Sequence, residues 1–221
     1  MLLSEDTRSV SNVSLFVVSA DKTLLPAKIQ EKLGDRPIIE LNLKLDGQKT
    51  LWQNDSAPVT ISIPYEPTEE ELKNSEHITV WDIDGQGNVI PVTSGRYDPK
   101  TGIVTFTTTH FSQYSVAYVN KSFNDLGKVP WAKKQIEVLT AKGIINGTSD
   151  NQFSPFDKIT RGDYIALLVR TLGLSAEFGS NFMDVKPTDY YYKEIGIAKE
   201  TGIALGSENN TFNPNGYISR Q

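Results

Sequence analysis

Apolar and polar residues alternate along much of the first half of the chain. Between residues 39 and 45 every second position is apolar, and the same period of two returns at 59–63. This period is typical of strands with one buried face, because successive side chains point to opposite faces of a sheet. Further apolar runs at 77–83, 88–92, 103–109 and 114–119 are separated by turn-forming residues. Short strands at this spacing predict an antiparallel β-sandwich within residues 1–119.

Two short helices are expected to interrupt these strands, one around 26–33 and one around 68–74. In the second, Thr68 and Glu71 stand three residues apart. A threonine at the N-cap and a glutamate three positions later can satisfy each other's backbone amides. This pair predicts a capping box at the start of that helix.

From residue 123 the pattern becomes helical. Pro130 stands where proline is tolerated, in a first helical turn, and Gly143 stands where a helix would stop. We expect Trp131, Ile136 and Leu139 to share one face of the helix between them. The first predicted helix therefore runs from about Pro130 to Gly143.

A glycine-rich turn containing Phe153 is expected at 143–155, followed by a helix from about Arg161 to Leu172. Gly173 is its predicted C-cap. Each unit is then helix, turn-rich loop, helix. The predicted fold class of the whole chain is α+β in two domains: an antiparallel β-sandwich followed by mainly α-helical repeats.

Residues 123–162 repeat at 182–221 without a gap, at an offset of 59. Twelve of the forty aligned positions are identical, where composition alone would give about two or three. The identical positions include the glycines at 143 and 147, which recur at 202 and 206. A period of this length predicts an array of small units that bury their apolar faces partly against each other.

Composition excludes several function classes. The 221-residue chain has a net charge of −5 with dispersed charges, so it lacks the basic stripe of a nucleic-acid binder. No apolar run approaches the roughly 18 residues of a membrane span. The first residues lack an apolar signal core, so an export signal is expected outside this segment. Without cysteine there are no disulfides, catalytic thiols or cysteine metal sites, and we predict no cofactor and no metal.

The repeated segment carries Phe-x-Asp at 123–125, Trp131, Gly-Ile-Ile-x-Gly at 143–147, Phe-Ser-Pro at 153–155 and Ile-Thr-Arg-Gly-Asp at 159–163. In this order, and twice, these residues resemble the S-layer homology family of Gram-positive cell-surface proteins. The resemblance predicts a first repeat at 123–178 and a second, truncated repeat at 182–221, after a sandwich module at 1–119.

The resemblance implies an extracellular location at the cell wall or S-layer surface. It also implies non-covalent binding to secondary cell-wall polysaccharide, often through an acidic pyruvate ketal. The family typically works with three copies around a pseudo-threefold axis. This chain holds one and a half, so further repeats are expected in the full-length chain or in a neighbouring chain.

Candidate glycan-binding residues are Arg161, Arg220, Trp131 and Gly147. Arg161 lies in the first turn of a predicted helix, and a guanidinium beside free helix-terminal amides suits a carboxylate. Surface ion pairing is the alternative for both arginines. For Trp131 and Phe153 the alternative is core or inter-repeat packing.

Thr160 and Asp163 form a predicted helix-capping motif around Arg161. The family pattern usually has Thr-Arg-Ala-Glu at these positions. Gly162 and Asp163 stand in place of its last two residues, which lowers helix propensity and shortens the acid.

The tripeptide His110-Phe111-Ser112 resembles the cleavage site of autoproteolytic sandwich domains. His110 could accept the Ser112 hydroxyl proton while that hydroxyl attacks the Phe111 carbonyl. The alternative is a plain final hairpin. The sequence Asp82-x-Asp84 before Gly85 superficially resembles a calcium loop, but it lacks the distal glutamate, and a polar hairpin turn explains it more simply.

The leading hypothesis is a non-enzymatic wall-anchoring segment of an exported protein, any catalytic domain lying outside it. The alternatives are a self-cleaving sandwich, or an accessory carbohydrate-binding part of a glycoside hydrolase. Exposed aromatic residues in a row would support carbohydrate binding, but Trp52, Tyr65 and Trp81 are too dispersed in the sequence to show such a row. The second repeat ends before its second helix. Tyr190, Ile195 and Phe212 are therefore expected to lack cover, and the last residues to be loosely held.

Overall fold

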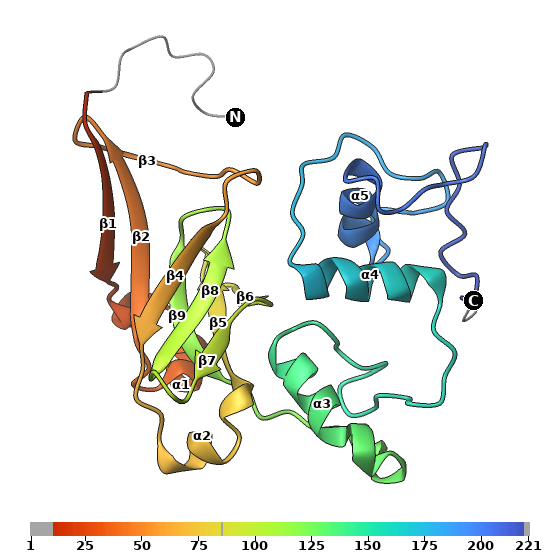
Figure 1. Ribbon diagram of the computed structural model, residues 1–221, viewed down its shortest axis with the longest axis horizontal. Coiled ribbons are helices and arrows are strands. Elements are labelled where there is room, and N and C mark those ends of the chain that lie inside the picture. Colours follow the sequence, from red (N-terminus) through yellow and green to blue (C-terminus); the bar gives the residue numbers. More distant parts are fainter. Residues whose placement is uncertain (1–10, 85, 219–221) are drawn as a thin grey trace. The chain divides into compact units, whose positions relative to one another are not determined.

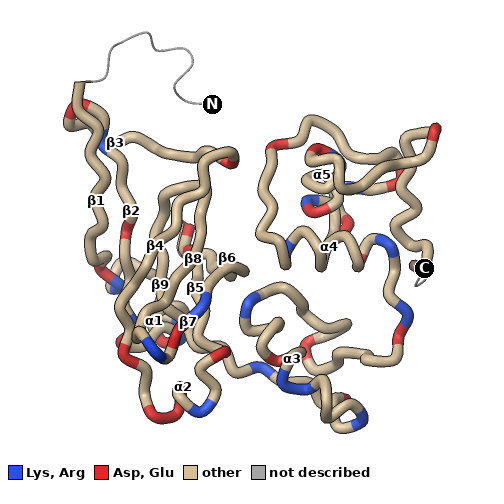
Figure 2. The backbone as a smooth tube through the Cα atoms, viewed as in Figure 1, with Lys and Arg blue, Asp and Glu red and all other residues tan. Residues whose placement is uncertain are grey.

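The computed structural model describes residues 11–84 and 86–218. It divides the chain into two compact units, Met1–Lys121 and Ser122–Gln221. The first unit is rich in strands and the second contains the sequence repeat (Figure 1). In both units Lys and Arg are interspersed with Asp and Glu along the backbone (Figure 2). None of the described helices is long and apolar enough to cross a membrane.

The strand-rich unit contains two antiparallel sheets. The larger has the order β1-β2-β9-β5-β6, with β3 also paired to β2, and the smaller has the order β4-β8-β7. The larger sheet comprises β1 (Val13–Ser19), β2 (Ile38–Leu45), β3 (Gln48–Thr50), β5 (Ile78–Ile83), β6 (Val89–Val92) and β9 (Gln113–Tyr118). The smaller comprises β4 (Val59–Pro64), β7 (Arg96–Asp98) and β8 (Ile103–Thr108).

The core of this unit lies between the two sheets, and sequence alternation decides which side chains enter it. In β4, Ile61 and Ile63 are buried while Thr60 and Ser62 beside them are exposed. They pack in one cluster with Val104 and Phe106 of β8 and with Val80, Tyr114 and Val116 of the larger sheet.

Short helices flank the sheets: η1 (Lys22–Leu24), α1 (Ala27–Leu33), α2 (Glu69–Lys73) and η2 (Ser75–His77). The capping box predicted for α2 is confirmed, because Thr68 and Glu71 exchange both side-chain-to-backbone bonds. Glu71 is buried and also accepts a hydrogen bond from the Tyr65 hydroxyl at 2.8 Å and bonds from Arg36. This network ties α2 to the sheet.

The second unit contains η3 (Leu126–Lys128), α3 (Pro130–Ala141), α4 (Arg161–Leu172) and α5 (Tyr192–Glu200). The predicted fold class is wrong, because the described residues of the repeats are not mainly helical. The described strands form the two antiparallel sheets of the first unit, and the described helices are short. Between the three α-helices of this unit, the described chain runs through long turns and loops.

The loops hold their shape through side-chain hydrogen bonds rather than helix formation. Asp125 accepts bonds from the amides of Phe153 (3.0 Å) and Ser154 (2.7 Å). Asp184, its counterpart in the second copy, accepts bonds from the amides of Phe212 (2.8 Å) and Asn213 (2.7 Å). The same contact thus fixes the loop in both copies, and it satisfies backbone groups that would otherwise need regular structure.

Helix limits follow the local signals closely. α4 spans the predicted residues, and Gly173 ends it in the left-handed conformation at φ 61°. In α3 the expected common face of Trp131 with Ile136 is wrong: the Trp131 side chain is 81% exposed and Ile136 is buried. Residues five apart are separated by about 140° around a helix, so the two side chains point in different directions.

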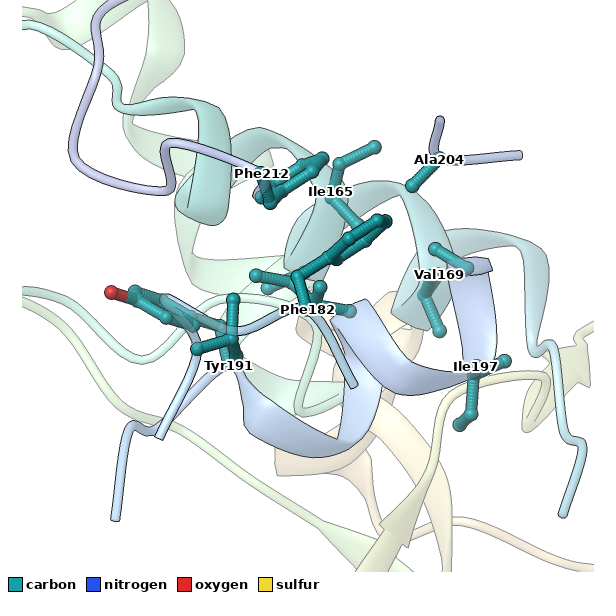
Figure 3. Packing of buried hydrophobic residues seen from close by; sticks show 11 residues of the cluster. Ile165, Val169, Phe182, Tyr191, Ile197, Ala204 and Phe212 are labelled. Atoms are coloured by element: carbon teal, nitrogen blue, oxygen red, sulfur yellow. The ribbon is translucent and has the colours of Figure 1, made fainter. Parts of the chain in front are cut away.

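The unit has two apolar cores, and α4 contributes to both. The first comprises Phe123, Leu126, Val129, Ile136, Ile144 and Ile145, with Leu167 of α4 packed against it. In the second, Ile165 and Val169 of α4 pack with Phe182 and Phe212 of the second repeat (Figure 3). Ala166 of α4 and Ile195 of the second repeat belong to the same cluster. One helix therefore packs against both repeats.

The expectation that the second repeat lacks cover is wrong for its core. Ile195 is 0% exposed and Phe212 is 3% exposed, because α4, which belongs to the first repeat by sequence, lies over them. Tyr190 remains 65% exposed. The final residues, 219–221, lie outside the described part of the chain.

Candidate functional site

The start of α4 is held by its own capping residues. The Thr160 hydroxyl oxygen accepts a bond from the Asp163 amide at 3.1 Å, and Asp163 accepts one from the Thr160 amide at 3.1 Å. The Thr160 hydroxyl in turn donates to the Asp163 carboxylate at 2.6 Å. These bonds fix the direction in which the first turn presents its side chains.

The first-turn amides of α4 are not free, contrary to the sequence-based account of the site. The amide of Arg161 donates to the Gly216 carbonyl at 2.7 Å, and that of Gly162 to the Pro214 carbonyl at 2.8 Å. The loop of the second repeat thus occupies the helix end. A negatively charged ligand at this place would meet the side chain of Arg161 rather than the backbone.

The Arg161 side chain is exposed and positioned by two contacts. Its Nη2 atom donates to the Leu205 carbonyl at 3.1 Å, and its guanidinium carbon lies 4.4 Å from the centre of the Phe212 ring. Among the described residues, no carboxylate pairs with it. A guanidinium held on an aromatic ring keeps donors free for a planar carboxylate, which it can bind with two parallel bonds.

Tyr190 extends this site on the exposed side. Its hydroxyl donates to Asp163, and its ring packs edge-on against Tyr191 at 4.7 Å between centroids. Burial, and then the bond to Asp163, raises the pKa of the Tyr190 hydroxyl above its ordinary value. Burial would also raise the pKa of Asp163, but bonds from Thr160 and Tyr190 outweigh it and lower that pKa. Tyr190 therefore stays neutral at neutral pH while Asp163 stays charged.

Sequence reasoning missed Leu205, Phe212 and Tyr190 as parts of this site. They lie far from Arg161 along the chain, and each has a local explanation as a loop or core residue. The one available signal is the repeat itself. Leu205 and Phe212 flank the loop that begins at Gly206, which is the second copy of the loop at Gly147.

Trp131 and Gly147 lie apart from this site. Among the described residues, no hydrogen bond, ion pair or ring contact joins either one to Arg161. The ring of Trp131 is exposed on α3 and available for stacking, so core packing does not apply to it. Phe153, by contrast, packs against Phe123 at 5.6 Å between centroids.

Gly147 has a steric reason to be glycine. Its φ is +76°, and an added Cβ would lie 2.4 Å from the Phe123 ring and 2.5 Å from the Gln152 carbonyl. Only glycine fits such a position without displacing its neighbours. Arg220, the fourth candidate glycan-binding residue, lies outside the described residues.

The contacts around His110 oppose self-cleavage. Its Nε2 atom lies 2.8 Å from the carboxylate of buried Asp82, and the Ser112 hydroxyl donates to the Ile83 carbonyl at 3.2 Å. No hydrogen bond joins His110 to Ser112 within the described chain, and Phe111 has no left-handed backbone. The proton transfer that cleavage requires has no path through these contacts.

The loop considered as an alternative calcium site is a hairpin turn. The Asp84 carboxylate accepts bonds from the amides of Gln86 (2.9 Å) and Asn88 (2.8 Å). Its oxygens are directed at the turn between β5 and β6. Within residues 11–84 and 86–218, no group of three or more His, Asp or Glu side chains is arranged to hold a metal ion.

Comparison with known proteins decides the family of the second unit. The model of the S-layer homology domain matches residues 122–165 and 181–221. Residues 122–221 belong to the S-layer homology family. The resemblance inferred from the repeated motifs is confirmed, and the match leaves the His110–Ser112 motif outside it.

The relatives include an amylopullulanase, an exoglucanase and a surface-layer protein. An amylopullulanase of Thermoanaerobacterium thermosulfurigenes is 35% identical over 169 residues, 75% of this chain and 9% of that protein. The exoglucanase XynX of Acetivibrio thermocellus is 37% identical over 101 residues, 45% of this chain and 9% of that protein. A surface-layer 125 kDa protein of Lysinibacillus sphaericus is 34% identical over 98 residues, 44% of this chain and 8% of that protein.

The chain thus spans less than a tenth of the length of these three relatives. No solved structure matches it. The S-layer homology segment is a cell-wall anchoring module, and its location is the extracellular cell-wall or S-layer surface. This agrees with the location predicted from the sequence.

Proposed function

We propose that residues 122–221 anchor an exported protein by binding secondary cell-wall polysaccharide, with Arg161 contacting a carboxylate on the glycan. The observation that supports this is the arrangement of Arg161. Its guanidinium is exposed, held against Phe212 and Leu205, and free of any carboxylate among the described residues. A pyruvate ketal presents the planar carboxylate that such a group binds best.

Arg220 is the counterpart of Arg161 in the sequence repeat and is proposed as the equivalent contact of the second copy. Trp131 is proposed to stack against a sugar ring through its exposed indole. One charge-assisted contact contributes about 1.5–3 kcal/mol, which is weak for an anchor. Further repeats in the full-length or a neighbouring chain would raise the avidity through effective concentration.

The whole protein is proposed to carry an enzyme or surface-layer body that this segment fixes to the wall. Enzymes and S-layer proteins both occur among the relatives. The amylopullulanase alignment is longer than residues 122–221, so it includes part of the strand-rich unit. A polysaccharide-degrading enzyme is therefore the proposed body of the whole protein.

Sedimentation with purified cell walls tests the anchor. We expect the 221-residue chain to be retained by walls that keep their secondary polysaccharide and released from walls stripped of it. Arg161→Ala should weaken retention by about tenfold or more, and Arg161→Lys should restore it only in part because an ammonium lacks the planar fork.

Arg96→Ala is the matched control, since it removes one exposed arginine from the strand-rich unit. It should leave retention unchanged. Equal binding to stripped and intact walls would contradict the proposal. So would a folded Arg161→Ala variant that binds as the unaltered chain does.

A further inference from the structure

The strand-rich unit contains a cavity that the anchoring function does not use. Its volume is about 610 Å³, within the roughly 300–1,000 Å³ typical of small-molecule sites. It forms where β2 changes its partner strand. Residues 38–40 of β2 pair with β9 and residues 43–45 with β3. The chain after β3 closes the gap, because the Trp52 carbonyl accepts a bond from the Phe111 amide.

One wall of the cavity is aromatic. Trp52 and Phe111 both line it, and their rings pack with centroids 4.4 Å apart. Phe111 is anchored through its amide, so the indole has a fixed support. A supported, half-buried indole offers a flat apolar surface of the kind that packs against the C–H face of a sugar ring.

The rest of the lining mixes apolar and polar side chains, and its charged members are Glu40, Lys49 and Asp84. Glu40 and Lys49 contribute to it as an ion pair, with 2.6 Å between Oε1 and Nζ. The Oδ1 atom of Asn42, which also lines the cavity, is buried and has no hydrogen-bond partner. A buried acceptor without a partner is unfavourable. A ligand with a hydroxyl group could donate a hydrogen bond to this oxygen and remove that cost.

We propose that this cavity binds a neutral sugar unit of a polysaccharide, stacked on Trp52 and donating a hydroxyl to Asn42. Glu40 and Lys49 then supply an acceptor and donors to neighbouring hydroxyl groups. An anionic ligand fits less well, because the Glu40–Lys49 pair is neutral and Asp84 adds a negative charge to the lining. A purely apolar ligand fits less well, because it would leave the Asn42 oxygen unpaired.

Isothermal titration of the 221-residue chain tests the proposal. The probes are maltohexaose, xylohexaose, cellohexaose and purified secondary cell-wall polysaccharide. We expect saturable binding of at least one of the four glycans. Trp52→Ala should weaken that binding by about tenfold or more, while Ile90→Ala, on the exposed edge strand β6 outside the cavity, should not change it.

Asn42→Leu separates a binding role from a structural one. It removes the unpaired acceptor, so the melting temperature should stay the same or rise while sugar affinity falls. This variant keeps the test decisive if Trp52→Ala fails to fold. Loss of binding in Asn42→Leu with an unchanged or higher melting temperature would support the proposal.

Two results would overturn the proposal. One is the absence of binding to all four glycans. The other is binding that persists in folded Trp52→Ala and Asn42→Leu variants. If only the wall polysaccharide binds, and this depends on Arg161 but not on Trp52, then the anchor stands and the cavity is not a sugar site. The two proposals can therefore fail separately.

Discussion

The two copies of the repeat share their loop contacts but not the way their cores are covered. In each copy an aspartate accepts hydrogen bonds from two loop amides. In each copy a phenylalanine ring also packs so close to a glycine that an added Cβ would clash with it. The second copy is covered by α4, which supplies Ile165 and Val169 to its core. The first copy receives Leu167 from the same helix, on the margin of a smaller cluster.

This difference shows that the unit of sequence and the unit of packing are not the same. α4 falls within the first repeat as predicted from the sequence, 123–178, but most of its apolar face belongs to the core of the second. A repeat aligned by sequence therefore lacks part of its own core. Stability should be shared across the repeat boundary rather than held within each copy.

The largest expected effect compares Ile195 with its counterpart Ile136. Ile195→Ala should destabilise the chain by about 3–4 kcal/mol, because it opens a cavity beneath α4. Ile136→Ala should cost about 2–3 kcal/mol, because its smaller cluster can relax toward solvent. Urea denaturation measures both. A larger loss for Ile136→Ala would contradict the assignment of α4 to the second core.

The next comparison substitutes alanine at Gly147 and Gly206. The added Cβ would lie 2.4 Å from the Phe123 ring in the first case and 2.5 Å from the Phe182 ring in the second. Each substitution should cost about 1–3 kcal/mol through overpacking. Gly147→Ala should cost more, because Gly147 alone of the two has a left-handed backbone.

Denaturation curves of the two alanine variants test this order, with Gly127→Ala as the control, since an added Cβ there meets nothing within 4 Å. Equal losses for Gly147→Ala and Gly206→Ala would show that backbone conformation contributes nothing at this position. If neither substitution lowers the free energy of unfolding, then steric crowding does not explain why both copies have glycine at this position.

The smallest expected effect concerns pH. The amide of Phe153, followed by that of Ser154, holds the pKa of Asp125 below its ordinary value despite some desolvation. A carboxyl group with a lowered pKa in the folded state stabilises above its unfolded pKa of about 3.9, and this contribution is lost as the pH falls through the folded value. Amide exchange at 153 and 154 should therefore accelerate in acid, relative to the intrinsic exchange rate at the same pH.

Asp125→Asn serves as the comparison for the pH experiment, because an amide keeps the size of the side chain but does not titrate in this range. Its exchange at 153 and 154 should be faster at neutral pH and should change less on acidification. If acid has the same effect on this variant and on the unaltered chain, then Asp125 is not the group responsible.

Local signals predicted local structure well. Thr160, Asp163 and Gly173 lie within or beside α4, and they define its limits through bonds to their own neighbours. The prediction overestimated the helical content of the repeats. Loops that Asp125 and Asp184 hold in place supply buried apolar side chains, as a helix would. The exposure of Trp131 follows from helix geometry, because residues five apart point in different directions. The prediction of a common face relied on the apolar character of Trp131 and Ile136 and not on this angle.

Long-range contacts could not be predicted in the same way. The apolar face of α4 was visible in the sequence, but a hydrophobic pattern does not say which element covers it. The contact of Arg161 with Phe212 joins the two copies of the repeat and depends on that packing. The cavity beside Trp52 depends on where β2 exchanges β9 for β3, a choice of strand register that alternation leaves open.

The position of α4 also bears on how such arrays can be shortened or joined. A fragment that begins at residue 182, where the alignment places the second copy, would leave Ile195 and Phe212 without their covering helix. A fragment that begins before Thr160 would keep that core and its helix cap together. Insertions and fusions should therefore be placed in the loop before α4. Recombination at this loop would transfer the core of the second repeat together with the helix that covers it.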